Sequence, residues 1–429
     1  MSTIKKIIGT ARQKELVKLY SDYVSKYKVG FFESLGLGVI QGERKGVKIK
    51  MLEGTADGEP PLELIDCHTS GGVFNLGHHH PEINQALREG LDAGLDIGDH
   101  HILSEQRALL AKQLADLLPG NICKTMFSAA GGEAIDLAIK LSRAFTNRKK
   151  IVSAKRAYHG VTGFALGACA SSFKDPFLWS LPDFQQVPFA DIEYLRKTMD
   201  EETACVLFET IPATGGILIP PEGYFAEVRE LCDDLGVVMI VDEVQTGLGR
   251  TGKMWGIYGG LYPNEKIVPD MIVLAKGMSA GVYPLSTTSY KPKFEEVFEE
   301  DPFLHISTTG GSELGCYVTM KMLDIITRPG FLKHVQNMGI KFGKGLTELQ
   351  QKSSEKVVDI RGRGLMWGIE FQDEFTSLYF TLKMIKNGVW CDYCGNYKVT
   401  NKFLPPLIIQ PNDIDEILHQ VEKTLGEID

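Results

Sequence analysis

The sequence lacks long apolar runs and any excess of positive charge. No stretch approaches the roughly 20 apolar residues that span a bilayer, and the first residues do not combine an apolar core with a small-residue cleavage site. Lysine and arginine total 46 against 55 aspartates and glutamates, which gives a net charge of -9. An acidic chain is a poor match for nucleic acid or an anionic membrane. We therefore expect a cytoplasmic protein whose partners are small molecules.

Cysteine is scarce and scattered. The eight cysteines lie mostly inside apolar stretches, as reduced core thiols do, so no structural disulfide is predicted. Only Cys391 and Cys394 have CxxC spacing, and neither a second pair nor a nearby histidine completes a zinc ligand set. The sequence therefore predicts no metal site.

The composition is that of a globular enzyme with more than one domain. The 429 residues are 43% hydrophobic and 24% charged, and their number suggests two or three domains. Residues 11–27 have helical apolar spacing. Short runs rich in valine, isoleucine and leucine then alternate with helical patterns, which predicts a parallel sheet covered on both faces. The runs are LELIDC (62–67), KTMFS (124–128), KIVSA (150–154), ACVLFE (204–209), VVMIVD (237–242) and MIVLA (271–275).

The character of the chain changes near residue 320. Helical patterns there lead into RGRGLMWGIEF (361–371) and a final helix, which is typical of a smaller α+β unit. We predict an N-terminal helix and segment (1–60) that packs with the small domain, a large α/β domain (61–322) and a small α+β domain (323–429).

Three strand ends carry polar groups that could bind a ligand. In open α/β sheets, ligands bind beyond the carboxyl ends of the strands. Residues 124–128 run into Ala129-Ala130-Gly131-Gly132 and then a helix, whose free N–H groups could hold a phosphate. A simple strand-to-helix turn is the alternative.

The other two strand ends carry Asp242 and Lys276. A buried strand delivers Asp242 to the crevice, where a carboxylate needs a cationic partner or caps the next element. Lys276 ends another such strand. Either it reaches out to solvent, or its desolvated amine forms a Schiff base with an aldehyde.

A glycine-rich loop follows Asp242 and resembles a nucleotide site. Residues 247–252 match GxGxxG, and residues 247–253 nearly match a P-loop, but Met254 replaces the required hydroxyl residue. The next residues, KMWGIYGGLYP, do not have the pattern of the helix that either phosphate site requires. A non-enzymatic nucleotide-binding module is therefore a remote alternative.

Together, the three strand ends offer what pyridoxal phosphate requires. The glycine turn suits the phosphate, Lys276 suits the aldehyde, and Asp242 suits a protonated pyridine nitrogen.

The chain resembles the class III (ω-amino acid) aminotransferases, pyridoxal-phosphate enzymes of fold type I. The most specific stretches are IVDEVQTGLGRTGKMW (240–255) and PDMIVLAKGMSAGVYPL (269–285). Further blocks match in the same order: GGVFNLGHHHPEI, AYHGVTG, FETIPATGGILIPPEGY, HISTTGGSELGC and RGRGLMWGIEF. The resemblance implies a large domain with a mainly parallel seven-stranded sheet and a smaller α+β domain.

The resemblance also implies roles around the cofactor ring. Asp242 would bind the ring nitrogen, Val244 one ring face and Gln245 the ring hydroxyl. Tyr158 would stack on the ring, and Lys276 would form the Schiff base.

Further roles concern the phosphate and the substrate. Ala130, Gly131 and Gly132 form the phosphate turn, and Thr308 would reach the phosphate of the neighbouring subunit in a homodimer with shared active sites. Arg361 would hold a substrate carboxylate by a bidentate contact, and Glu209 would pair with Arg361 when no carboxylate is bound.

Some positions depart from the family pattern. The turn usually reads Asn-Ser-Gly-Thr-Glu, so Ala129, Ala130 and Gly132 remove side-chain hydrogen-bonding groups. Pro212 replaces a usual glutamine, and residues 312–313 replace Asn-Pro. Residues 171–199 are similar to the diamine (putrescine-type) branch.

The resemblance predicts a ping-pong aminotransferase. An amine or amino acid donor would give its amino group to the cofactor, and a 2-oxo acid such as 2-oxoglutarate or pyruvate would accept it. Because a fold does not fix the reaction, an amino-acid racemase, an epimerase or a decarboxylase on the same fold is the alternative.

Overall fold

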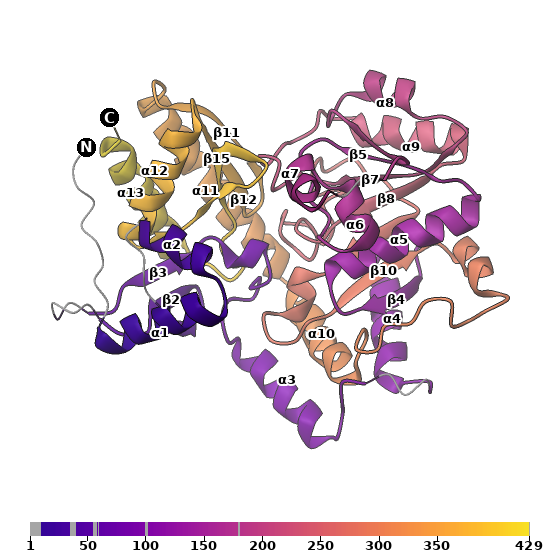
Figure 1. Ribbon diagram of the computed structural model, residues 1–429, viewed down its shortest axis with the longest axis horizontal. Helices are drawn as coiled ribbons and strands as arrows, with labels where there is room; N and C mark the ends of the chain where they lie inside the picture. Colours follow the sequence, from indigo (N-terminus) through magenta and orange to yellow (C-terminus); the bar gives the residue numbers. More distant parts are fainter. Residues whose placement is uncertain are drawn as a thin grey trace.

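Two lobes make up the molecule, seen side by side in Figure 1. The computed structural model describes residues 10–34, 40–54, 58, 60–98, 102–178 and 181–428. One lobe contains the middle of the chain. The other contains the C-terminal part together with the N-terminal segment from residue 10 onward.

The large lobe is built on a seven-stranded sheet with the strand order β4-β10-β9-β8-β7-β5-β6. Strand β10 is antiparallel to both of its neighbours, β4 and β9, and all other neighbouring strands in this sheet are parallel. The predicted mainly parallel seven-stranded sheet is confirmed. Its strands are β4 (Lys124–Ser128), β5 (Lys150–Ala154), β6 (Phe184–Val187), β7 (Thr203–Glu209), β8 (Val238–Asp242), β9 (Met271–Leu274) and β10 (Ser286–Tyr290).

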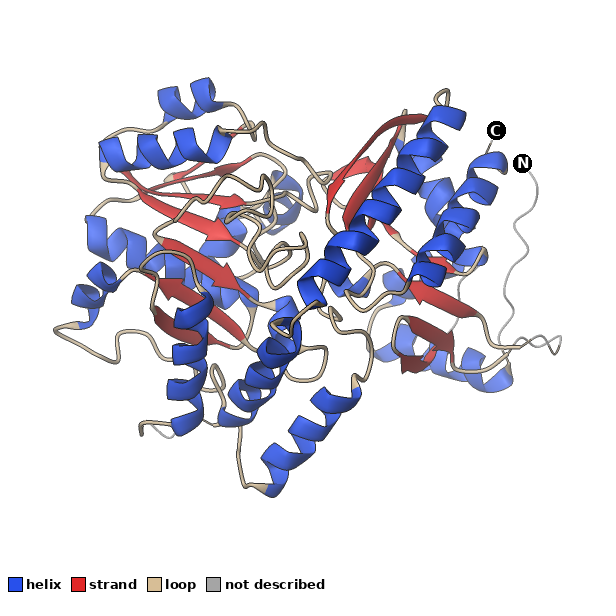
Figure 2. Cartoon of the chain, turned by 180° about the vertical axis from the view of Figure 1, so that it is seen from behind, coloured by secondary structure: helices blue, strands red, loops and turns tan. Residues whose placement is uncertain are grey.

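Helices cover both faces of this sheet, as Figure 2 shows. Successive residues of β8 alternate between two hydrophobic clusters, with Ile240 in one and Val241 in the other. Both faces of the strands are therefore buried, which explains their unbroken apolar runs. The helices of this lobe are α3 (Pro81–Asp92), α4 (Glu105–Leu117), α5 (Gly131–Thr146), α6 (Gly163–Ala168), α7 (Ser171–Lys174), α8 (Ile192–Thr198), α9 (Tyr224–Leu235) and α10 (Glu313–Ile326).

The C-terminal lobe packs three helices against a sheet with the order β11-β12-β15-β14. Its core includes Phe342 of α11, Phe380 of α12 and Phe403 of β15, whose rings meet edge to face. The elements are α11 (Phe331–Lys352), β11 (Val357–Arg363), β12 (Met366–Phe371), α12 (Glu374–Lys386), β13 (Val389–Trp390), β14 (Asp392–Cys394), β15 (Tyr397–Phe403) and α13 (Pro411–Gly426).

The N-terminal segment joins this lobe through a third sheet with the order β1-β2-β3-β13. The apolar pattern of the run 62–67 suggested a strand of the large sheet, and this prediction is wrong. Strand β3, which contains most of the run, pairs with β2 and β13 instead. The helix predicted over residues 11–27 is two helices. The division at residues 60 and 322 stays a prediction. The elements are α1 (Ala11–Tyr23), α2 (Lys26–Ser34), β1 (Gln41–Lys45), β2 (Lys48–Met51) and β3 (Glu63–Asp66).

Within the described ranges, no helix is both long and apolar enough to cross a membrane.

Candidate active site

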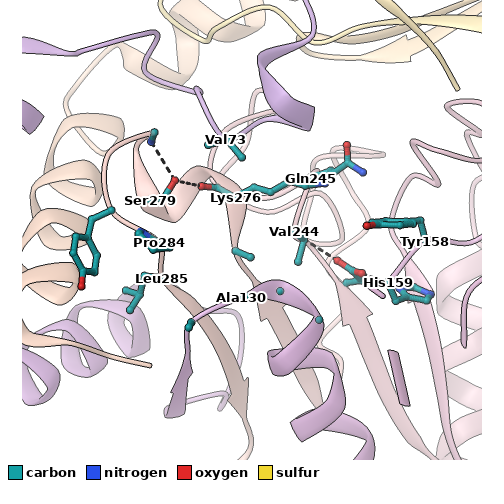
Figure 3. A pocket seen from close by; sticks show the side chains of 18 of the residues that line it. Val73, Ala130, Tyr158, His159, Val244, Gln245, Lys276, Ser279, Pro284 and Leu285 are labelled. Atoms are coloured by element: carbon teal, nitrogen blue, oxygen red, sulfur yellow. Dashed lines mark hydrogen bonds and ion pairs between the residues drawn. The ribbon is translucent and has the colours of Figure 1, made fainter. Parts of the chain in front are cut away.

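A cavity of about 420 Å³ lies at the carboxyl ends of β8 and β9. Figure 3 shows the side chain of Lys276 extending through it toward Gln245. The cavity brings together the predicted ring-binding and turn residues and leaves out Arg361 and Thr308. The predicted residues in its wall are Ala130, Gly131, Gly132, Tyr158, Glu209, Asp242, Val244, Gln245 and Lys276.

The glycine turn leaves the start of α5 open to a ligand. Ala130 precedes the helix and makes no side-chain cap, so the first N–H groups of α5 are not capped by it. A Cβ atom on Gly132 would lie 2.7 Å from Thr162 Oγ1, and one on Gly131 would lie 3.2 Å from Ala275 Cβ. Both contacts are tighter than usual, so glycine is favoured at these positions and leaves backbone exposed to the cavity. The turn therefore has the features of an anion site at a helix N-terminus.

Lys276 sits on a strained backbone at the end of β9. Its φ is 39°, in the left-handed region that is sparsely populated by non-glycine residues and that clusters at functional sites. In the side-chain amide orientation that satisfies its neighbours, Gln245 donates to Gly71 O at 3.2 Å and accepts from Lys276 Nζ at 3.2 Å. Gln245 therefore helps to position the amine.

The environment of Lys276 favours the neutral amine. Burial lowers its pKa from 10.5 to about 8, and the positive charge of Lys402 adds to this effect, while the carboxylates of Asp242 and Glu209 oppose it. An amine with this pKa is partly deprotonated at neutral pH, unlike an ordinary lysine. The structure thus supports the reactive role of Lys276 over a solvent-exposed one.

Asp242 is buried, and each of its oxygens has a donor. Oδ1 accepts from the Val244 N–H at 3.0 Å, and Oδ2 lies 2.8 Å from His159 Nδ1. His159 also lines the cavity. Sequence reasoning missed His159, although it follows Tyr158 directly in the matched block AYHGVTG and so could have been found there.

Glu209 lies beside Asp242 and not beside Arg361. The two carboxylates are register partners on β7 and β8, and Glu209 accepts from the Tyr158 N–H at 3.1 Å. Burial, with a further contribution from the charge of Asp242, raises the pKa of Glu209 to about 7, although His159 and Lys276 oppose the shift. Glu209 therefore anchors the backbone of Tyr158 here, and the predicted pair between Glu209 and Arg361 is not found.

Arg361 is occupied by other carboxylates. Its Nη1 lies 2.8 Å from Asp359 Oδ2 and 2.6 Å from Glu370 Oε2, and its Nε donates to Gly216 O at 2.9 Å. Asp359 and Glu370 are directly opposite on β11 and β12. Like charges at such positions repel, so Arg361 neutralises the pair and lies outside the cavity wall.

The glycine-rich loop after Asp242 joins the two lobes. The buried guanidinium of Arg250 donates to Leu365 O at 2.8 Å and to Asn75 Oδ1 at 2.6 Å. No helix follows the loop within residues 247–270. The nucleotide alternative therefore lacks the helix it requires.

Among the described residues, no three or more histidine, cysteine or acidic side chains gather where they could hold a metal ion. Cys391 and Cys394 are buried free thiols.

Each chemical group of pyridoxal phosphate has a counterpart in the cavity. The turn at α5 suits the phosphate, Asp242 the ring nitrogen, and Lys276 the aldehyde. The residues present fit this cofactor, and the sheet that carries them is the one expected of a pyridoxal-phosphate-dependent enzyme of fold type I.

Comparison with known proteins identifies the family. A family model described as "Aminotransferase class-III" matches residues 40–425. An uncharacterized aminotransferase of Archaeoglobus fulgidus is 47% identical over 412 residues, covering 95% of this chain and 93% of that protein. The chain belongs to the class III aminotransferases and is a pyridoxal-phosphate-dependent aminotransferase.

Solved structures share the fold. A transaminase from the marine bacterium Virgibacillus has a TM-score of 0.86 at 25% identity, covering 96% of this chain and 98% of that one. Ornithine aminotransferase from Toxoplasma gondii, whose structure has partial occupancy of the cofactor at its active site, has a TM-score of 0.84 at 23% identity, covering 97% of this chain and 94% of that one.

Proposed function

We propose that this enzyme moves an amino group by a ping-pong mechanism from an amine or amino acid donor to a 2-oxo acid. One observation carries the proposal: a lysine amine, a carboxylate and an open helix N-terminus share one cavity of about 420 Å³. The similarity of residues 171–199 to the diamine branch makes diamines one donor class to test within this proposal.

The chain's own residues hold the cofactor and move the protons. The first N–H groups of α5, next to Ala130, would bind the phosphate. Tyr158 and Val244 would hold the ring, and Gln245 would bind its hydroxyl. When bound, pyridoxal phosphate supplies an aldehyde that takes up the amino group and a ring that withdraws electrons from the substrate.

Lys276 acts twice in this scheme. Its Nζ would hold the cofactor through the aldehyde carbon, and once freed by the donor amine, the same Nζ would be the base that accepts the proton of the donor carbon and gives it back. The pKa of about 8 suits both roles, because a base works best when its pKa is near the working pH. Asp242 would stabilise a positive charge on the ring nitrogen.

The acceptor carboxylate is better matched by Lys402 than by Arg361. Arg361 already contacts two carboxylates. Half-buried Lys402 of β15 also lies outside the cavity wall, but it makes no ion pair within the described part of the chain, and its positive charge contributes to the lowered pKa of Lys276. We therefore propose that Lys402 attracts the carboxylate of the 2-oxo acid.

Replacing Lys402 by methionine is expected to raise the KM for the 2-oxo acid about tenfold or more, because a charge-assisted contact is worth roughly 1.5–3 kcal/mol. The donor half-reaction should change less, because Lys402 is the smallest of the four causes that set the pKa of Lys276. Steady-state kinetics with the acceptor varied would measure the effect, with Lys398→Met, an exposed lysine on the same strand, as control. Equal acceptor KM values in the two variants would contradict this role.

An apolar surface supports the proposed homodimer. Ile102 and Leu103, before α4, are 76% and 101% exposed, and Leu304, four residues before Thr308, is 57% exposed. Arg107 of α4 donates to the carbonyls of Gly310 and Gly311, which holds these segments together. Large exposed apolar side chains of this kind mark protein interfaces.

We expect a second copy of the chain to cover this surface and bring its Thr308 to the phosphate turn. Thr308 is exposed and does not line the cavity of its own subunit, as a role in the neighbouring subunit requires. Sedimentation equilibrium should give twice the 47.5 kDa chain mass. Replacing Leu103 by aspartate should shift the population toward monomer. A monomeric, fully active wild type would refute the shared site.

The absorption spectrum of the purified protein tests the function itself. Diamines, ω-amino acids and α-amino acids, added without an acceptor, should remove the visible band of the bound cofactor in at least one case. Addition of 2-oxoglutarate or pyruvate should restore it. An enzyme that exchanges the donor proton in deuterated solvent while its band persists would instead be a racemase or epimerase, which would contradict the proposal.

A further inference from the structure

A second cavity, of about 610 Å³, lies between the two lobes. The connection between β8 and β9, including Thr251 and Tyr262, forms one wall, and α11 with the β11–β12 hairpin forms the other. Among the described residues, this wall has none in common with that of the active-site cavity. A space of this size accommodates a small molecule. We call it the interlobe cavity.

Positive charge in the interlobe cavity is not balanced by acids of its wall. The cations of the wall include Arg363, at the end of β11, and Lys344 of α11, whereas no acidic side chain of the described residues lines it. Lys344 forms an ion pair with Glu348 at 3.9 Å, but both side chains are exposed, and such contacts contribute little. In a chain of net charge -9, an uncompensated positive wall favours an anionic ligand.

Arg363 is held in place with part of its guanidinium free. Its Nε donates to Leu261 O and its Nη1 to Gly362 O, each at 2.9 Å. The guanidinium also lies over the ring of Tyr262, 5.3 Å from the centroid. Within the described chain, Nη2 has no hydrogen-bond partner and Arg363 makes no ion pair. A guanidinium fixed in this way loses little conformational entropy when it binds a carboxylate or a phosphate.

The interlobe cavity also offers an aromatic surface. A Cβ atom on Gly343 would lie 2.2 Å from Trp367 Cζ2, so this glycine lets α11 pack directly on the indole. The indole N–H donates to Gly364 O at 2.7 Å, which fixes the orientation of the ring. Trp367 is half-buried, and its remaining surface lines the cavity. Such a surface suits the ring of a flat ligand.

A buried hydroxyl in the same wall has no partner. Thr251 is 7% exposed, and its Oγ1 makes no hydrogen bond with the described residues. Buried polar atoms are normally paired, either within the protein or with another molecule. Independently of the charges, this hydroxyl indicates a polar ligand at the wall.

We propose that the interlobe cavity is a second ligand site, which binds a flat organic anion: an aromatic or heteroaromatic ring that carries a phosphate or a carboxylate. The anionic group would meet Arg363 and Lys344, and the ring would lie on Trp367. Because the ligand would contact both lobes, its binding should stabilise the folded protein. The site does not depend on which donor and acceptor the enzyme uses.

Calorimetric titration of the protein saturated with pyridoxal phosphate tests this site, because the cofactor then fills the phosphate turn of the active site. The probes are naphthyl phosphate and naphthoate, which join one ring to either anionic group. Naphthylmethanol supplies the ring alone, and inorganic phosphate the charge alone. We expect at least one anionic probe to bind one molecule per chain, at least about tenfold more tightly than both controls, because charge-assisted contacts add to ring burial. The tighter probe identifies the anionic group.

A matched pair of variants locates the site. Ile340 of α11 lines the cavity and is 68% exposed, so replacing it should not disturb the core. Ile340→Glu places a carboxylate in the wall and pairs with Lys344 four residues later. It should weaken binding at least about tenfold and abolish the rise in Tm that the probe causes in the wild type. Ile340→Gln has the same shape as the glutamate without its charge and should bind like the wild type.

Arg363→Met should weaken binding as Ile340→Glu does, and the Ile340 pair keeps the test valid if the methionine variant does not fold. Equal binding by the two Ile340 variants would place the probe elsewhere and overturn the proposal. Naphthylmethanol bound as tightly as both anions, or no binding of either anion up to about 1 mM, would overturn it as well. None of these results bears on transamination, which the absorption band of the bound cofactor reports separately.

Discussion

Replacing Lys276 by alanine is expected to reduce multiple-turnover transamination by a factor of at least about one thousand, because one side chain acts both as nucleophile and as base. The variant should still take up pyridoxal phosphate, since the phosphate turn and Asp242 do not depend on the lysine. Steady-state assays with donor and acceptor, together with the absorbance of the reconstituted protein, would measure both properties.

A matched control distinguishes this loss from general damage. Lys253 is an exposed lysine of the glycine-rich loop, and Lys253→Ala should retain wild-type turnover. If Lys276→Ala kept wild-type turnover, the assignment of the reactive amine would be wrong. A decrease in the Lys253 variant equal to that of Lys276→Ala would show that the assay reports loop damage.

Replacing Asp242 by asparagine should lower kcat by about 100-fold to 1,000-fold. The amide has nearly the same shape but no charge, so the ring nitrogen loses the partner that keeps it protonated, and the electron-withdrawing power of the ring falls. The amide NH₂ would also face the donor N–H of either Val244 or His159, which leaves a buried donor unpaired. The change should appear in the rate of the donor half-reaction.

Asp242→Glu keeps the charge but moves it by one methylene. We expect an intermediate rate for it, above that of the asparagine variant. Single-turnover mixing with an amine donor would separate the chemical step from substrate binding. An asparagine variant as fast as the wild type would show that the ring nitrogen has no need of a charged partner at this site.

The sequence could predict most of the large sheet because burial on both faces leaves a strong apolar signal. Two strands of this sheet, β6 and β10, were not predicted. Strand β10, with the sequence Ser-Thr-Thr-Ser-Tyr, is fully buried yet hydroxyl-rich. Apart from that of Ser286, its hydroxyls find partners inside the protein, such as Thr288 Oγ1, which donates to Ala134 O at 2.7 Å. Such partners are far away in sequence, so no local pattern could reveal them. The prediction for the run at 62–67 was wrong for a different reason. Its apolar pattern indicates a buried strand, but it does not indicate which sheet the strand joins.

The part of the candidate site that lies at strand ends was predictable from the sequence. Lys276 and Asp242 are conspicuous there, and the structure brings both to one cavity. Arg361 shows the limit of resemblance. A matching motif identifies the arginine but does not predict which side chains surround it. Here Asp359 and Glu370 form ion pairs with Arg361. The matched block contains His159, but its contact with Asp242, 83 residues later, forms only in the folded chain.

The single antiparallel strand sets the order in which the site can assemble. Strand β4, which leads into the phosphate turn, is at the sheet edge and pairs only with β10. The bond from Thr288 to Ala134 spans 154 residues. During synthesis from the N-terminus, β4 and the start of α5 therefore wait for residue 290 before they acquire their sheet neighbour. Closing so long a loop is entropically slow. The phosphate turn therefore gains its sheet neighbour only after Tyr158, Asp242 and Lys276 have been synthesised.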